Sequence, residues 1–334
     1  MTEQSPPEHW ACLAGGNALG IFQAGAIEAL LDADVRITRV AGTSIGAVTA
    51  ALWFGGPAES ASHRLRTYWE RATENYVVGG VRAARRAAAS RALVGGQSGL
   101  FRPSLPGFFS ATPMAPPVDH LHSTAPMRRT LEELVDFDRL NDGRVRVIVN
   151  ALDQQTAEEV VFDSARVPLT VDHVMASSAL PLLFPPVEID GRALVDAGLS
   201  ANLPIAALFA DPPQRDTVCW AIDLWPPVAE RATSLEAVAR RQNDLIFAAQ
   251  SKHALQRVAE TVSPVLQEAG VRAAVHHLGY DGGTWEIGTK AFDYSSTALQ
   301  RRARAGRAAM DRALAGPSAL DGAGLHLVRH PFHG

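Results

Sequence analysis

The five residues Gly42-Thr43-Ser44-Ile45-Gly46 constrain the fold of this chain more than any other segment. They follow an apolar run at residues 37–41 and precede an alanine-rich run at residues 47–54 that is typical of a helix. The pattern predicts a strand, a sharp turn and a helix, with flanking glycines that leave the serine hydroxyl exposed above the N-terminus of the helix. Ser44 is therefore a candidate nucleophile, and Gly42 and Gly46 are the candidate glycines of a nucleophile elbow.

A glycine-containing turn lies upstream of this elbow. Residues 9–14 are expected to form a short buried strand, Gly15-Gly16-Asn17-Ala18-Leu19-Gly20 to turn, and a helix to follow as far as Asp32. The backbone N–H groups of such a turn can hold a phosphate or the oxyanion of an acyl-transfer intermediate. The glycine spacing does not match Gly-x-Gly-x-x-Gly, and no Gly-Lys-Ser/Thr follows, which disfavours a nucleotide site. A plain tight turn remains the structural alternative.

An aspartate lies downstream at the end of another predicted strand. Asp190-Gly191 separates residues 187–189 from residues 192–195, which is typical of a hairpin with a primed turn. The second strand ends in Asp196-Ala197-Gly198. An aspartate in this position can point its carboxylate into the cleft of an elbow serine, although ordinary turn chemistry explains the residue as well.

Together these three motifs, in this order, resemble the signatures of the patatin-like phospholipases, acyl hydrolases with a serine-aspartate dyad. The resemblance continues through residues 174–181 and 184–187, which are similar to the segment before the catalytic aspartate. Residues 221–225 and 292–295 are similar to the C-terminal extension of a bacterial subgroup, an extension without an assigned role.

The resemblance implies roles for individual residues. Ser44 would be the nucleophile, Asp196 the base, and the backbone N–H groups around Gly15, Gly16 and Asn17 the oxyanion hole, with Gly198 in the turn after the acid. Three positions differ from the family pattern: Asn17 and Leu19 replace a glycine and a basic residue, and Ala197 replaces a glycine. Because aspartate has a reference pKa near 3.9, burial must raise the pKa of Asp196 for it to act as a base.

A Ser-His-Asp triad is the competing mechanism, with His173, His276 and His277 as candidate bases. The early position of Ser44, after only a second predicted strand, disfavours it. A short-chain esterase or thioesterase with the same dyad is a further alternative. So is a catalytically weak lipid-binding or regulatory protein of the same fold.

The order of predicted elements favours an α/β fold, a patatin-like three-layer α/β/α arrangement with a mainly parallel central sheet. Further strands are expected at residues 144–152, 158–162 and 217–224, and helices near residues 59–73, 127–135, 234–261 and 295–315. We expect a flexible N-terminus at residues 1–8, a patatin-like catalytic region at residues 9–210, and a C-terminal extension at residues 211–334 that packs on the same domain.

Residues 76–125 interrupt this alternation with glycines and prolines. They are expected to form an excursion over the mouth of the active site, a lid or binding loop. The segment combines apolar side chains, including Phe108 and Phe109, with arginines such as Arg82 and Arg85, a mixture that suits an anionic lipid surface. A solvated basic helix beside a few core residues is the alternative.

Charge and composition restrict the remaining functional classes. A net charge of −4 and the lack of Lys/Arg runs argue against nucleic acid as a partner. No metal-binding motif occurs, and the dyad chemistry requires neither a metal nor a cofactor. Cys12 and Cys219 are expected to be reduced core residues. The start of the chain does not resemble a secretory signal, and no run approaches the roughly 18 apolar residues of a spanning helix. We therefore expect cytoplasmic residence, a phospholipid or other acyl-ester substrate, and contact with a membrane at most at its surface.

Overall fold

A mixed sheet lies at the centre of the computed structural model, which describes residues 6–74, 80–104, 107 and 118–332. Most of the predicted flexible N-terminus, and Phe108 and Phe109 of the predicted lid, lie outside these described residues. The strands of the sheet are β1 (Glu8–Leu13), β2 (Ile37–Gly42), β5 (Arg146–Asp153), β6 (Glu159–Asp163), β7 (Val187–Ile189), β8 (Arg192–Asp196), β9 (Thr217–Asp223), β10 (Arg272–Gly279) and β11 (Gly324–Arg329). Strands β3 (Arg102–Pro103) and β4 (His122–Ser123) form a separate two-stranded ribbon.

The strand order of the sheet is β11-β10-β9-β1-β2-β5-β8-β7, with β6 paired to β5. All pairs from β11 to β5 are parallel, whereas β6, β8 and β7 pair antiparallel. The chain runs from β1 to β2 and β5 on one side and later returns to place β9 on the other side of β1. The order of the strands thus reverses beside β1, and in open α/β sheets ligands bind at the carboxyl ends of the strands at such a point.

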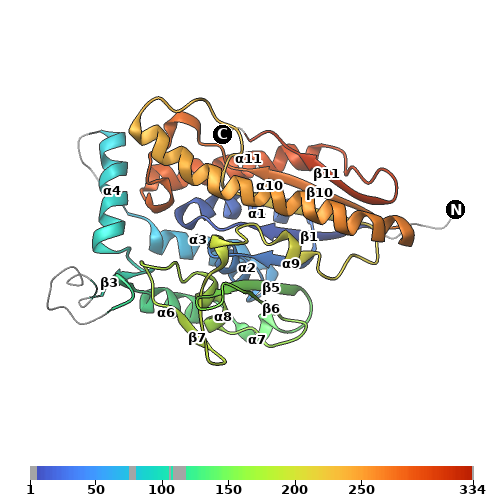
Figure 1. Ribbon diagram of the computed structural model, residues 1–334, viewed down its shortest axis with the longest axis horizontal. Helices are drawn as coiled ribbons and strands as arrows, with labels where there is room; N and C mark the ends of the chain where they lie inside the picture. The colour runs from blue at the N-terminus through green and yellow to red at the C-terminus, as the bar shows by residue number, and fades with distance from the viewer. Residues whose placement is uncertain (1–5, 75–79, 105–106, 108–117, 333–334) are drawn as a thin grey trace.

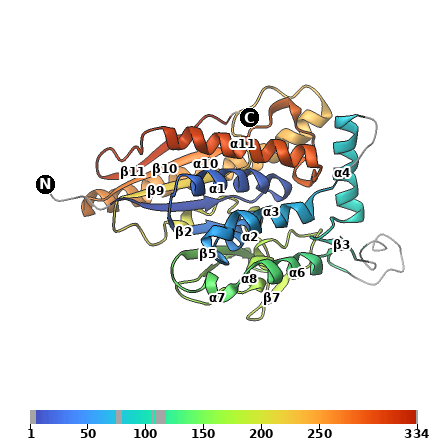
Figure 2. The same ribbon diagram turned by 180° about the vertical axis from the view of Figure 1, so that it is seen from behind.

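Helices cover both faces of the sheet. Helix α10 crosses one face (Figure 1), and α1, α2 and α11 cover the opposite face (Figure 2). The helices are α1 (Ile21–Asp32), α2 (Ile45–Phe54), α3 (Ala61–Ala72), α4 (Val81–Gly95), α6 (Ala125–Leu134), α7 (Phe137–Leu140), α8 (Val171–Ser177), α9 (Ile205–Leu208), α10 (Leu235–Ala269) and α11 (Ser296–Ala315). Short 3₁₀ turns are η1 (Asn17–Gly20), η2 (Ala58–Ser60), η3 (Ala197–Leu199), η4 (Gly283–Trp285) and η5 (Lys290–Phe292). The predicted α/β fold with a mainly parallel sheet is confirmed.

The central strands are buried on both faces, which explains their continuous apolar sequences. Every residue of β9 is buried, as are the last four residues of β1. Cys12 and Cys219 lie in these two strands, buried and without a disulfide, as predicted. Among the described residues, no helix has the length and apolarity needed to span a membrane.

Helices α1 and α11 touch through glycines. A Cβ on Gly25 would lie 1.9 Å from the carbonyl oxygen of Ala303, and one on Gly306 would lie 1.9 Å from that of Phe22. These distances leave no room for a methyl group, so the two backbones approach as closely as glycine allows. The last helix of the chain is thereby packed directly on the first.

The predicted hairpin is confirmed in detail. Strands β7 and β8 pair antiparallel, and both residues of the connecting turn have positive φ, 50° at Asp190 and 76° at Gly191. This is the primed turn that an Asp-Gly pair favours. The turn sets the register of β8 and so the position of Asp196 at its end.

Part of the predicted excursion is regular structure, because α4 forms within residues 76–125 and buries Arg85, which is only 2% exposed. In addition, β10 and β11 extend the sheet, although the sequence suggested no strands there. The apolar stretch that holds His276 and His277 is β10.

Candidate active site

Ser44 occupies the turn between β2 and α2 with the strained backbone that an elbow requires. Its φ is 55° and its ψ is −124°, and α2 begins at the next residue. A non-glycine residue with positive φ is uncommon and persists where the surrounding structure imposes it. Thr43 N–H donates to the Leu13 carbonyl at 3.1 Å, which ties the elbow to the end of β1.

Gly42 and Gly46 lie too close to other backbone atoms for a larger residue to replace them. A Cβ on Gly42 would lie 2.4 Å from the carbonyl carbon and oxygen of Gly46. A Cβ on Gly46 would lie 2.1 Å from the carbonyl oxygen of Leu13. Both obstacles are backbone atoms that cannot move aside, so the sequence pattern follows from close approach of β1, β2 and α2.

Asp196 ends β8 beside Ser44. Its carboxylate is 4% exposed, accepts the Gly198 N–H at 2.7 Å and lines the same cavity as Ser44. Burial raises the pKa of Asp196 to about 6, although the Ser44 hydroxyl and the Gly198 N–H act in the opposite direction. The structure therefore brings the predicted serine and aspartate together, with the raised pKa that a carboxylate base needs near neutral pH.

The turn after Asp196 accommodates its departure from the family pattern. Ala197 is not among the residues with positive φ, and it opens the 3₁₀ turn η3, so its Cβ causes no backbone strain. Gly198 remains the constrained position, because a Cβ there would lie 2.9 Å from the Asp196 carboxylate and 3.1 Å from the Asn202 amide oxygen.

The predicted oxyanion loop follows β1, and one of its three residues needs correction. Gly15 N–H donates to the Asn202 carbonyl at 3.0 Å and is not free to bind an oxyanion. The N–H groups of Gly16 and Asn17 have no acceptor among the residues that the structure describes. Gly16 and Asn17 line a cavity beside Ser44 and remain candidate donors.

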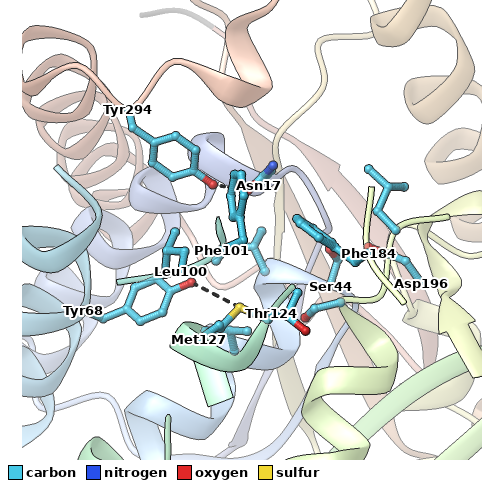
Figure 3. Close-up of a pocket in the computed structure, with 14 residues that line it drawn as sticks. Asn17, Ser44, Tyr68, Leu100, Phe101, Thr124, Met127, Phe184, Asp196 and Tyr294 are labelled. Atoms are coloured by element: carbon cyan, nitrogen blue, oxygen red, sulfur yellow. Dashed lines mark hydrogen bonds between the residues drawn. The ribbon is translucent and has the colours of Figure 1, made fainter. Parts of the chain in front are cut away.

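Residues far along the chain hold this loop in place. Trp225 Nε1 donates to the Gly15 carbonyl at 2.8 Å, and Asn202 Nδ2 donates to the same oxygen at 3.1 Å. The Tyr294 hydroxyl donates to Oδ1 of Asn17, whose φ is 52° (Figure 3). Sequence reasoning missed these contacts, because nothing in a single sequence pairs residues 210 and 277 positions apart.

The loop has a cation nearby, although Leu19 replaces the basic residue of the family pattern. Its side chain is fully buried, but Arg302 from α11 reaches the same loop and donates to the Ala18 carbonyl at 3.3 Å. The guanidinium thus comes from a distant helix and contacts the backbone of the loop.

Two further serines were not singled out by the sequence. Ser177, at the end of α8, accepts the Ser44 N–H through its Oγ at 2.9 Å and so fixes the elbow from outside. Ser178 lines the same cavity as Ser44, and its buried hydroxyl has no hydrogen-bond partner among the described residues. Both lie in the segment that resembles the family sequence before the acid.

Two cavities meet at Ser44 and Asp196, and Asn17 and Leu180 also line both of them. The first has a volume of about 40 Å³ and is shown in Figure 3, with Tyr68, Phe101, Met127 and Phe184 among its walls. The second has a volume of about 210 Å³ and is walled partly by the C-terminal segment. A substrate bound to Ser44 would extend into one or both of them.

The three candidate histidines lie away from this site. His173 caps its own helix by accepting the Thr170 N–H at 2.9 Å through Nδ1, His276 contacts His330, and His277 contacts Asp223. No described histidine lines either cavity at Ser44, so the geometry gives no support to a triad. The described residues also hold no group of three or more His, Cys, Asp or Glu side chains suited to a metal ion.

Buried charges join α4 to the C-terminal segment. Arg85 contacts Glu286 at 2.6 Å and Asp293 at 2.7 Å, and Arg302 contacts Glu286 at 2.9 Å. Burial alone would raise the pKa of Glu286, but Arg302 and Arg85 lower it to about 2, so it stays ionised. Asp293 precedes Tyr294, so this cluster fixes the segment that presents Tyr294 to the oxyanion loop.

The arginines expected at a lipid surface are engaged within the protein. Arg85 is buried in the cluster just described, Arg82 and Arg86 contact Glu236, and Arg91 contacts Glu74. A set of cations paired in this way is not a free basic patch. Arg85 also does not fit the alternative of a solvated basic helix, because its side chain is buried.

Comparisons with known proteins agree with this geometry. A family model described as patatin-like phospholipase matches residues 11–209, which include Ser44 and Asp196. No curated protein matches the chain.

Solved structures give distant similarities. VipD from Legionella pneumophila is 15% identical, with a TM-score of 0.46, and the match covers 93% of this chain and 67% of VipD. The type III effector ExoU is also 15% identical, with a TM-score of 0.39, and the match covers 93% of this chain and 53% of ExoU. The complex of SpcU with ExoU from the type III secretion system of Pseudomonas aeruginosa gives a match of 14% identity and a TM-score of 0.30. That match covers 80% of this chain and 53% of the matched chain. This chain therefore spans about half the length of ExoU.

The Tyr294 hydroxyl gives a direct test of how the oxyanion loop is held. Tyr294→Phe removes one hydrogen bond to Asn17, which costs about 1 kcal/mol of positioning. We therefore expect kcat for p-nitrophenyl butyrate to fall about fivefold with little change in KM. Tyr68→Phe is the matched control, because Tyr68 lines the same cavity and its hydroxyl contacts Met127 Sδ at 4.0 Å rather than Asn17. Equal losses in the two variants would contradict the assignment.

Proposed function

The chain belongs to the patatin-like phospholipase family, a family of lipid hydrolases, and from this premise we propose that it is a serine acyl hydrolase with Ser44 as nucleophile and Asp196 as base. The observation that carries the proposal is that Ser44, at the elbow, and a buried Asp196 line the same two cavities, and that burial raises the pKa of Asp196 to about 6. A carboxylate with such a pKa is ionised at neutral pH and is a stronger base than an exposed aspartate.

In the first half of the reaction, Asp196 accepts the hydroxyl proton as Ser44 Oγ attacks the ester carbonyl carbon. The carbonyl oxygen becomes an oxyanion that the N–H groups of Gly16 and Asn17 stabilise. The tetrahedral intermediate then expels the alkoxide, which takes the proton from Asp196 and leaves as the alcohol. An acyl ester on Ser44 and an ionised Asp196 remain.

In the second half, Asp196 removes a proton from a water molecule that attacks the acyl carbonyl. The same N–H groups stabilise the second oxyanion. Collapse of this intermediate breaks the bond to Ser44 Oγ, which recovers its proton from Asp196. The products are a carboxylic acid and the free enzyme, so both proton transfers balance.

The substrate class in this proposal is a lipid acyl ester, as in a phospholipase of the A type. A short-chain esterase or thioesterase on the same dyad is the second candidate, and the small volume of the first cavity, about 40 Å³, favours it. That space holds a few water molecules but no long acyl chain. A lipid-binding protein without turnover is the candidate of a different class.

We also propose that residues 76–125 cover the mouth of the site. Leu100 and Phe101, in the described part of this segment, line the cavity with Ser44. We further propose that the protein resides in the cytoplasm and contacts a membrane at its surface. Two free thiols in the core are compatible with a reducing compartment.

Labelling of the purified protein tests the dyad. We expect a fluorophosphonate probe to label wild type but not Ser44→Ala, and Asp196→Asn to remain folded while its kcat for p-nitrophenyl butyrate falls by about 10³-fold or more. Ser178→Ala is the control for a second serine in the same cavity and should still be labelled. A folded wild type that is not labelled would contradict the proposal and favour the lipid-binding alternative.

The pH profile tests the base. Because only ionised Asp196 accepts the proton, kcat/KM should rise with pH, reach half its maximum near the pKa of about 6, and stay level up to pH 8. At pH 5 the value should be about tenfold below the plateau, one pH unit being a factor of ten in the ionised fraction. Circular dichroism at pH 5 controls for unfolding. A midpoint near 4 would show an unperturbed carboxyl and contradict the role of burial.

A further inference from the structure

The C-terminal segment has no role in the family resemblance, yet it lines the larger cavity beside Ser44. We propose that this segment builds a substrate-binding chamber for an uncharged, mainly apolar group of the ester, and that the chamber does not take a phosphate head group. The inference rests on the proposed function and extends it to the chemistry of the substrate.

The walls of the chamber come from two sources. The catalytic region contributes Gly16, Asn17, Leu180, Gly198, Leu199 and Asn202 beside Ser44 and Asp196. The C-terminal segment contributes the rest of the wall, namely Trp225, Asn243, Phe247, Ala291 and Phe292. All five lie beyond residue 209, where the family match ends. With a volume of about 210 Å³, this chamber offers more space at Ser44 than the first cavity, which has about 40 Å³.

The C-terminal wall is aromatic. The rings of Trp225 and Phe247 lie 4.5 Å apart between centroids, and Phe292 lines the same chamber. Aromatic and aliphatic surfaces of this kind stabilise an apolar group by removing it from water. The Asn243 side chain is exposed and adds one amide at the chamber, which suits a hydroxyl or carbonyl group.

The charge of the chamber decides which group it accepts. Asp196 is the only charged side chain among the described residues that line it. Three cations lie near the lining residues in sequence, and each has a partner outside the lining, although Lys290 Nζ also lies 5.1 Å from the ring centroid of Trp225. Arg240 donates to the Glu286 carbonyl at 2.8 Å, Arg241 donates to the Pro226 carbonyl at 2.8 Å, and Lys290 contacts Asp244 at 2.5 Å.

A phosphate in this chamber would therefore be unpaired. It would find no cation in the lining and would lie near the carboxylate of Asp196. An uncharged group meets neither cost. The phosphate of a phospholipid substrate would have to remain outside the chamber.

A buried ion pair fixes the two parts of the C-terminal wall. Lys290 and Asp244 are 3% and 3% exposed, and each adjoins a lining residue, since Ala291 follows Lys290 and Asn243 precedes Asp244. Helix α10 and the turn η5 are thereby held together. The chamber is a preformed part of the fold, so ligand binding requires little rearrangement.

Binding of two matched ligands tests the chamber without turnover. We would titrate Ser44→Ala with 1-octanol and with octyl phosphate at pH 7.5 by isothermal calorimetry, since the two ligands share a chain and differ in the phosphate. We expect octanol to bind at least tenfold more tightly. Equal affinities, tighter binding of octyl phosphate, or no binding of octanol would overturn the proposal.

A charge placed at the chamber tests its position. In the Ser44→Ala background, Asn243→Lys should raise the affinity for octyl phosphate at least fivefold, because it supplies the missing cation. Gln242→Lys is the matched control, since Gln242 is exposed on the same helix but does not line the chamber. Equal gains in both variants, or no gain in either, would contradict this location.

Kinetics of otherwise wild-type enzyme identify which uncharged group enters. Phe247→Ala enlarges the chamber and should shift the optimal chain length in one of two series, p-nitrophenyl esters of increasing acyl length or acetates of increasing alcohol length. The series that shifts identifies the group as the acyl chain or the alcohol. Leu245→Ala, at a position 53% exposed and outside the chamber, is the control and should shift neither. No shift with Phe247→Ala would overturn the proposal.

The two proposals fail in different ways. Loss of the expected ligand preference, with Ser44 still labelled by a fluorophosphonate, would contradict the chamber and leave the hydrolase intact. The expected ligand preference without any labelling would support the chamber and contradict the hydrolase.

Discussion

The hydrogen bond from Trp225 Nε1 to the Gly15 carbonyl connects the two parts of this molecule on which the site depends. Gly15 opens the loop whose next two residues line the cavity with Ser44 and Asp196, and Trp225 follows the strand β9 that lies beside β1 in the sheet. The Asp223 carboxylate accepts the N–H groups of Leu224 and Trp225 at 2.7 and 3.3 Å, which turns the chain so that the indole reaches the loop. Tyr294 holds Asn17 in the same loop.

This arrangement explains why the C-terminal segment packs so closely on the catalytic region. Glycines at positions 25 and 306 bring α11 against α1, and α11 presents Arg302 to Glu286 and to the Ala18 carbonyl. Arg85 reaches the same carboxylate cluster from α4. Removal of one partner from such a buried cluster leaves an unpaired charge, which is strongly destabilising. The cluster therefore joins α4 to the C-terminal segment. Through Tyr294 it also holds the loop at Asn17.

The local parts of the site were predictable from sequence, and the long-range parts were not. The elbow at Ser44, the Asp190-Gly191 turn and the strand that ends at Asp196 depend on glycine, turn chemistry and apolar runs, which act between neighbours in the chain. Strand β10, with two histidines and three alanine or glycine residues among eight, lacks the β-branched composition that marks a buried strand. The hydrogen bond from the Gly15 N–H to the Asn202 carbonyl depends on tertiary packing across the sheet. The same holds for the contacts of Trp225 and Tyr294.

The central claim is that the C-terminal segment completes an acyl-transfer site at Ser44. A crystal structure of the wild-type protein after reaction with an uncharged octylphosphonate ester that phosphonylates Ser44 tests it most directly, because the adduct resembles the tetrahedral intermediate. We predict that the phosphonyl oxygen lies within hydrogen-bond distance of the Gly16 and Asn17 N–H groups, with the octyl chain against Trp225 and Phe247. An oxygen directed away from these N–H groups, or a chain that avoids the C-terminal segment, would contradict the account.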